Sequence, residues 1–98
     1  MNKAWASFAP LTDRIVAILK ELVHIPSPAG HTEAAIRFLE AELDQLGIRH
    51  ERTRRGALVG SIPGREAGPH RTLTAHVDTL AAMVKSIEKD GLIRLTQV

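Results

Sequence analysis

His76 and Asp78 are the two residues of this chain whose types and spacing best suit chemistry. They end the segment Arg-Thr-Leu-Thr-Ala-His-Val-Asp at residues 71–78. Because side chains alternate along a strand, residues two apart lie on one face, so an imidazole and a carboxylate can share one crevice. Such a pair suits a metal-binding imidazole whose other ring nitrogen is held by the carboxylate. By itself the spacing is a weak signal, because a histidine near a strand end is more often structural than a metal ligand.

The first positioning element is a predicted helix. Apolar residues recur at helical spacing over residues 11–22. Thr12 is the expected N-cap, because its hydroxyl oxygen can accept a hydrogen bond from a free backbone N–H of the first turn. The helix is expected to stop near His24, since Pro26 disfavours helical geometry in the residue before it. A stiff loop, Ile-Pro-Ser-Pro-Ala-Gly, follows at residues 25–30.

A second predicted helix begins around Thr32 or Glu33. An acidic residue near its start suits the helix dipole. Its apolar stripe ends at Leu46, and Gly47 is a good C-terminal stop.

After this helix the apolar pattern changes to period two, which favours strands. The expected elements are an exposed strand over 48–54, a buried strand over 57–62, a surface loop over 63–69, an interior strand over 72–77, and strands over 83–88 and 92–98. Asp90-Gly91 between the last two is a hairpin signal. The order of elements predicts an α/β fold, in which two N-terminal helices pack on a mixed β-sheet and the chain ends in a β-hairpin.

Composition indicates a soluble, intracellular protein. The chain has 98 residues, enough for one small domain, with 44% hydrophobic and 24% charged residues. Its net charge is +2, and it has no cysteine for a disulfide or a thiolate metal site. No apolar run approaches the roughly 20 residues that a membrane-spanning helix needs. We therefore expect a cytoplasmic location and no membrane partner.

The other histidines and the arginine cluster have simpler interpretations than a site. His24 lies at a predicted helix end, where an imidazole suits the helix dipole, and His31 could help to cap the second helix. His50 and His70 lie in charged or loop surroundings. Four arginines gather at positions 49, 52, 54 and 55, as in a nucleic-acid patch. Glu51 interrupts them, and no aromatic residue is interleaved for base stacking. A solvated strand face or a subunit contact is favoured, and no nucleic-acid partner is expected.

Several segments together resemble the start of the M42 family of metallo-aminopeptidases. They are Leu-Lys-Glu-Leu-Val-His-Ile-Pro-Ser-Pro-Ala-Gly at 19–30, the helix ending in Leu-Gly at 46–47, Thr-Ala-His-Val-Asp-Thr at 74–79, Met-Val-Lys at 83–85 and Asp-Gly-Leu-Ile-Arg-Leu-Thr-Gln-Val at 90–98. The resemblance covers about residues 11–98, in the family's order. The M20 and M28 zinc exopeptidases share a His-x-Asp at a strand end, but the hairpin after it favours M42.

The resemblance implies a zinc-exopeptidase-like catalytic domain with two divalent metal ions, usually zinc or cobalt. It makes His76 a ligand of one metal and Asp78 the residue that orients it, as part of the catalytic site. The remaining ligands and the general base are expected beyond Val98. Residues 1–80 correspond to part of the catalytic domain, and 81–98 to a hairpin leading into a second, incomplete β domain. Ala81 departs from the family, in which many members have glycine.

The function that this resemblance implies is hydrolysis of N-terminal residues from peptides by a cytoplasmic enzyme. Family members often form homo-oligomers, among them dodecamers. The chain is expected to be an N-terminal portion that is inactive alone, because it offers one metal ligand and no general base. The alternative is a non-catalytic truncated or assembly protein of the same fold.

Overall fold

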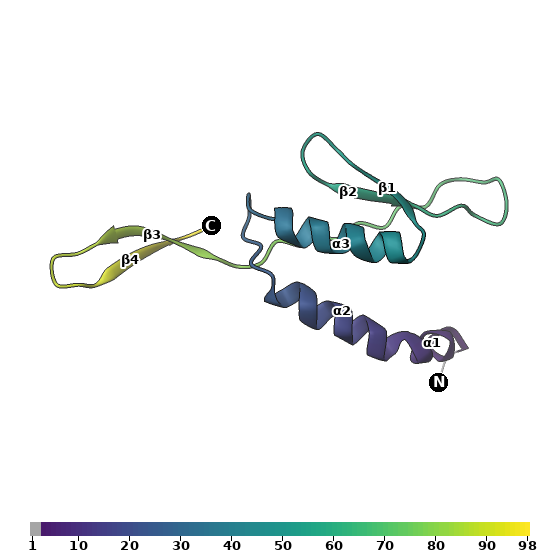
Figure 1. Ribbon diagram of the computed structural model, residues 1–98, viewed down its shortest axis with the longest axis horizontal. Coiled ribbons are helices and arrows are strands. Elements are labelled where there is room, and N and C mark those ends of the chain that lie inside the picture. The colour runs from purple at the N-terminus through teal and green to yellow at the C-terminus, as the bar shows by residue number, and fades with distance from the viewer. Residues whose placement is uncertain (1–2) are drawn as a thin grey trace.

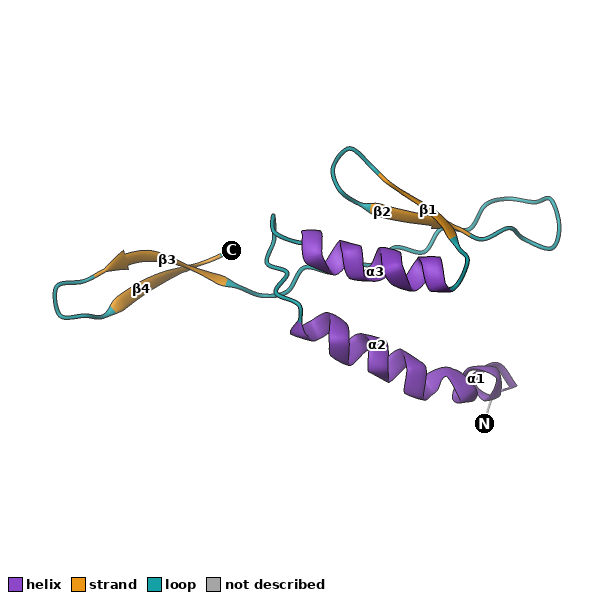
Figure 2. Cartoon of the chain, viewed as in Figure 1, coloured by secondary structure: helices purple, strands orange, loops and turns teal. Residues whose placement is uncertain are grey.

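The two expected helices form where the apolar periodicity places them. The computed structural model describes residues 3–98, and Figures 1 and 2 show its elements. Helix α2 spans Thr12–His24, and helix α3 spans Glu33–Gln45. Ile25 has extended backbone, as expected before a proline, and this ends α2. Gly47, with φ of 66°, follows α3 in the left-handed region that glycine adopts readily.

The beginning of α2 differs from the prediction. A short helix, α1 (Lys3–Phe8), and a 3-10 turn, η1 (Ala9–Leu11), precede it directly. Leu11 therefore occupies the N-cap position, and no side chain caps the helix. The prediction of Thr12 as N-cap is wrong, because the preceding turn supplies a backbone partner: the Thr12 N–H donates to the carbonyl of Ala9.

The strands form two separate antiparallel hairpins. Strand β1 (Arg49–Arg52) pairs with β2 (Leu58–Ser61), and β3 (Ala82–Ile87) pairs with β4 (Ile93–Gln97). Figure 2 shows the first hairpin beside α3 and the second projecting away from the helices. The predicted terminal hairpin and the exposed strand after α3 are confirmed.

Both hairpins close through the same three-residue turn. In the second, the Glu88 N–H donates to the Leu92 carbonyl at 2.8 Å, and the Gly91 N–H donates to the Glu88 carbonyl at 3.0 Å. The turn at Gly56 repeats both bonds, each at 2.9 Å. Gly56 and Gly91 both have φ of 85°, the left-handed conformation that such a turn requires at its third residue. The positions of these glycines therefore fix both strand registers.

The predicted mixed sheet does not form among the described residues. Their strands make two two-stranded sheets, and one isolated parallel bridge joins Pro28 to Thr79. Residues 72–77, predicted as an interior strand, carry no strand pairing, and Leu73 is 99% exposed. The strand predicted as buried over 57–62 is mostly exposed, with Val59 at 44%. Apolar, β-branched composition favours extended backbone, but a strand interior to a sheet also needs a partner on each side. Strand β2 has a partner on one side only, and residues 72–77 have no strand partner.

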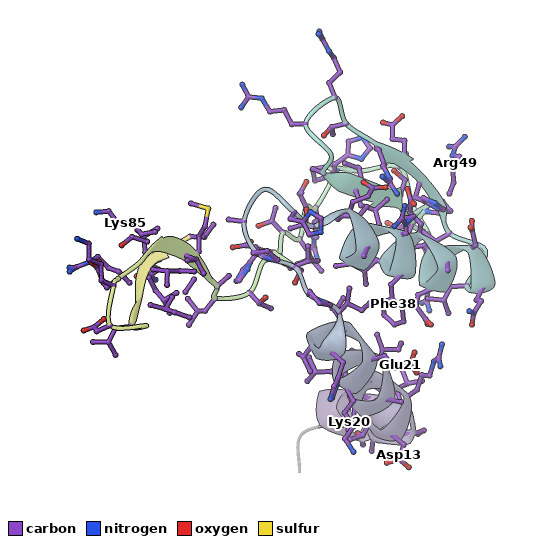
Figure 3. All side chains as sticks on the ribbon, turned by 60° about the vertical axis from the view of Figure 1, so that its left-hand side comes forward. Asp13, Lys20, Glu21, Phe38, Arg49 and Lys85 are labelled. Atoms are coloured by element: carbon purple, nitrogen blue, oxygen red, sulfur yellow. The ribbon has the colours of Figure 1, made fainter. Side chains whose placement is uncertain are left out.

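Helix α3 is the element to which α2 and the first hairpin attach. The two buried hydrophobic residues in the described part of the chain, Ala35 and Ile36, lie near its start. Phe38 lies between α3 and α2 in Figure 3. Arg14 of α2 donates hydrogen bonds to Glu42 and Gln45 on α3. The helices are thus joined by a small apolar contact and one polar cluster.

Arg52 of β1 joins the first hairpin to α3. Its guanidinium donates two 2.8 Å hydrogen bonds to the Glu33 carboxylate and also binds Glu40. These hydrogen bonds and the charge of Arg52 lower the pKa of both Glu33 and Glu40, and the same contacts raise the pKa of Arg52. The pairing of one guanidinium with two carboxylates sets how the hairpin lies against the helix.

The chain is extended and exposes much of its apolar surface. Its dimensions are 65 × 36 × 23 Å (Figure 1), and its accessible surface is 9148 Å². A compact monomer of 10.7 kDa would expose about 5,500 Å² by the usual mass scaling. Large apolar side chains on α2 and on the second hairpin contribute to the excess, among them Leu19, Val23 and Ile87. None of the helices described has the length and apolar character needed to cross a bilayer.

The left-handed glycine in the second hairpin gives a first prediction. Gly91→Ala should destabilise the β3–β4 pairing by about 1 kcal/mol, because a Cβ is strained at a positive φ. Hydrogen exchange of the cross-strand amides should therefore accelerate about fivefold. Gly68→Ala in the exposed loop at 63–69 is the matched control, and equal exchange in both variants would contradict the assignment of register to this turn.

The Arg52 cluster gives a prediction on pH. Since the folded-state pKa values of Glu33 and Glu40 lie below the ordinary 4.5, their stabilising effect is fully present above about pH 4.5. It is lost as the pH falls through the lowered values. Arg52→Gln should therefore lower the free energy of unfolding in urea at pH 7. It should also make the decrease of that free energy below pH 4.5 less steep. Unfolding would be followed by circular dichroism.

Arg49→Gln is the control for this experiment. Arg49 lies on the same strand, forms no salt bridge with the residues described, and extends away from the body of the chain in Figure 3. Arg49→Gln should leave the pH dependence of the free energy of unfolding as it is in the wild type. If both variants showed the same pH profile, Arg52 would not be the source of the effect.

Candidate functional site

His76 and Asp78 come together as the sequence predicts, although no strand carries them. The His76 Nδ1 atom lies 3.2 Å from the Asp78 carboxylate oxygen Oδ1 and also 3.2 Å from the Asp78 backbone carbonyl oxygen. It can donate to both oxygens of the one residue. This arrangement selects the tautomer with hydrogen on Nδ1 and leaves the Nε2 lone pair available.

Both side chains are open to solvent. The His76 side chain is 80% exposed and the Asp78 side chain 50% exposed. An exposed imidazole with a carboxylate on Nδ1 has the donor chemistry of a metal-binding histidine, because neutral Nε2 is a common ligand of zinc and similar metals. Within residues 3–98, however, no three histidines or carboxylates lie close enough together to hold a metal ion. The described residues thus supply a single oriented ligand.

A serine in the loop after α2 holds this segment. Ser27 is buried, with 1% of its surface exposed, and its Oγ–H donates to the Val77 carbonyl at 2.8 Å. The Thr79 N–H donates in turn to the Ser27 carbonyl at 2.9 Å. The sequence pattern predicts only a stiff loop at residues 25–30 and not this contact. The prolines on both sides of Ser27, which favour extended backbone, are the one signal that could have indicated pairing.

The other histidines that make hydrogen bonds are oriented by backbone carbonyls. His24 Nδ1 lies 2.6 Å from the Lys20 carbonyl, at the end of α2, and His50 Nδ1 lies 3.1 Å from the Ile48 carbonyl. The nearest carboxylate to His50, that of Asp44, is 3.8 Å away, beyond hydrogen-bond distance. Among the described residues, His76 is therefore the histidine whose Nδ1 binds a carboxylate.

The arginine cluster does not form one free basic surface. Arg52 is engaged by Glu33 and Glu40, and Arg54 lies in the turn of the first hairpin. This fits the interpretation of a solvated strand face. The absence of a nucleic-acid partner stays a prediction.

Comparison with known proteins points to one family. Residues 56–98 match the family model described as M42 glutamyl aminopeptidase. The matched stretch contains His76, Asp78 and both strands of the second hairpin.

Two curated relatives extend this comparison. The chain is 44% identical over 82 residues to a Bacillus subtilis protein named "Putative aminopeptidase YhfE", a match that covers 84% of this chain and 24% of the relative. It is 35% identical over 72 residues to a Pyrococcus abyssi protein named as a putative LysW-lysine/LysW-ornithine hydrolase, covering 74% of this chain and 21% of the relative. The chain therefore spans about a quarter of the length of the curated relatives it matches.

The geometry of the pair predicts how zinc binding responds to Asp78. Asp78→Asn should weaken binding of zinc at His76 by about tenfold, because the carboxylate makes the imidazole a better ligand. The chain would be titrated with zinc chloride and followed by the ring nitrogen resonances of each histidine. Asp44→Asn, which removes the distant carboxylate near His50, should leave zinc binding at every histidine unchanged. Equal binding at His76 in wild type and Asp78→Asn would contradict the role of the carboxylate.

Proposed function

The chain belongs to the M42 family of glutamyl aminopeptidases, and we propose that it is part of a dinuclear metal-dependent aminopeptidase. In this proposal His76 is a ligand of one metal ion, and Asp78 holds the imidazole in the orientation that binding requires. The observation that carries it is the 3.2 Å contact between His76 Nδ1 and the Asp78 carboxylate, which leaves Nε2 free for a metal.

The pair has a defined task in such an enzyme. His76 would hold one of two divalent metal ions, zinc or cobalt in this family, which when bound would supply Lewis-acid chemistry at a scissile carbonyl and activate a water near neutral pH. His76 holds its metal through a neutral nitrogen, and Asp78 keeps the hydrogen on the opposite nitrogen. A general base and the other ligands are not assigned to residues of this chain, because its described part holds no ligand cluster around His76.

The large exposed surface supports the proposal that this chain works within a larger structure. About 3,600 Å² of surface exceeds what a compact protein of this mass would expose. Apolar side chains on α2 and on the second hairpin are suited to burial against further protein. We place residues 1–80 in the catalytic domain, with a zinc-exopeptidase-like fold, and residues 81–98 at the start of a second β domain. Further apolar contacts would join the subunits of a homo-oligomer.

The substrates in this proposal are peptides with free N-termini. One relative is named an aminopeptidase, and the other is named a hydrolase of LysW-lysine and LysW-ornithine. Hydrolysis of an amide bond is a reaction that both names accommodate. A cytoplasmic location is consistent with the lack of cysteine and belongs to the same proposal.

A non-catalytic role is the second candidate. The observation in its favour is that the described residues contain one oriented ligand, whereas a catalytic zinc site usually has three protein ligands. An assembly protein of the same fold would keep the hairpins and the α3 contacts and would have no need of His76.

Substitution of His76 separates the two functions. The protein would be expressed from its complete coding sequence, loaded with zinc or cobalt, and assayed on amino-acid anilides and short peptides. His76→Ala should remove about one metal ion per subunit and lower turnover by at least 100-fold, because the second metal alone cannot position the hydroxide. Metal content would be measured by atomic emission.

His50→Ala is the matched control, since the hydrogen bond of the His50 ring among the described residues is to a backbone carbonyl and not to a carboxylate. It should retain the metal content and turnover of the wild type. Unchanged metal and activity in His76→Ala would exclude the proposed role of His76. Absence of both in the wild type would favour the non-catalytic alternative.

A further inference from the structure

The contact between the Ser27 loop and the histidine segment is the best-defined link in the molecule that the proposed chemistry does not use. Ser27 is the one polar side chain that is fully buried among the described residues. Its hydroxyl is 2.8 Å from the Val77 carbonyl and 3.4 Å from the Thr79 hydroxyl. The Thr79 N–H donates to the Ser27 carbonyl, and Pro28 pairs with Thr79 in a parallel bridge.

These hydrogen bonds restrain the backbone on both sides of Asp78. The Val77 carbonyl belongs to the peptide unit just before Asp78, and the Thr79 N–H belongs to the unit just after it. Fixing both peptide units fixes the direction of the Asp78 side chain and its distance from the His76 ring. The local conformation on which the pair depends is therefore set from a loop 50 residues away in the sequence.

Within residues 3–98 the pair has no other rigid support. Residues 72–77 have no strand pairing, and the His76 and Asp78 side chains are exposed. Figure 1 shows the chain returning past α3 and meeting the loop after α2 just before the second hairpin. A segment without ladder hydrogen bonds samples many conformations unless side-chain contacts restrict it.

We infer that Ser27 is a positioning residue that holds Asp78 against His76 and so sets the tautomer of the imidazole. Its hydroxyl acts on the Val77 carbonyl, not on a substrate or a metal. The consequence for metal binding rests on the proposed function, but the positioning itself can be measured without any metal.

The test uses ring nitrogen NMR of the full chain labelled with ¹⁵N-histidine, free of metal and at a pH where the imidazoles are neutral. In the wild type, His76 should be mainly the Nδ1–H tautomer, because that hydrogen is bound by Asp78. Ser27→Ala removes the hydroxyl and should lower the ratio of Nδ1–H to Nε2–H tautomers at His76 on the order of fivefold, the effect of losing one hydrogen bond.

Two features separate positioning from a general loss of structure. His24 and His50 are internal controls, because their Nδ1 atoms lie against the carbonyls of Lys20 and Ile48, which are not among the groups that Ser27 binds. Their tautomers should not change. Ser27→Cys keeps the size of the side chain with a weaker donor, so its His76 ratio should fall between those of the wild type and Ser27→Ala.

The outcomes are distinct. An unchanged His76 ratio in Ser27→Ala would overturn the inference, and so would a parallel shift at all three histidines, which would indicate unfolding. A change confined to His76 supports it. Zinc added afterwards tests the proposed function separately: if wild-type His76 did not bind zinc but still responded to Ser27→Ala, the positioning would stand and the metal role would fall.

Discussion

The bridge between Pro28 and Thr79 determines how the histidine segment lies relative to the helices. One backbone bond and one buried hydroxyl join the loop after α2 to the residues around Asp78. The loop can make these contacts because Pro26 and Pro28 keep its backbone extended. The short Ser27 side chain can then reach the backbone carbonyl of Val77 on the neighbouring segment. Everything that follows in the chain, including the second hairpin, projects from this junction (Figure 1).

Polar contacts set how the elements of the helical layer are arranged. With few buried hydrophobic residues in the part described, the relation of α2 to α3 depends on Arg14, and that of β1 to α3 depends on Arg52. Exposed ion pairs contribute little stability each, because water screens them and long side chains lose entropy on pairing. These ion pairs set the orientation of the elements relative to one another and add little to the free energy of unfolding. A small apolar core and several oriented polar contacts suit a piece of structure whose remaining faces are covered by other protein.

The elements that could be predicted from the sequence are those set by local interactions. The periodicity of α2 and α3, the stop at Gly47 and the Asp-Gly turn each depend on residues within a few positions of one another, and each is found in the structure. The strand expected over 72–77 depends on partners distant in the sequence, and composition carries no information on whether they are present. For the same reason Ser27 was missed: its role arises from a contact with Val77.

The pairing of His76 with Asp78 was predictable for a different reason. Two residues separated by one position can meet in any extended segment, so their contact survives although the strand does not form. What the spacing could not specify is which ring nitrogen the carboxylate would bind. The contact at Nδ1, with Nε2 left available, is the feature of the geometry on which the proposed metal binding rests.

The most direct measurement is an X-ray structure of the protein expressed from its complete coding sequence. Crystals would be grown with zinc, and diffraction data would be recorded at the zinc absorption edge. An anomalous peak about 2.0–2.1 Å from His76 Nε2, with Asp78 still bound to Nδ1, is the expected result. Zinc bound elsewhere in the molecule, with no peak beside His76, would contradict the assignment of His76 as a metal ligand.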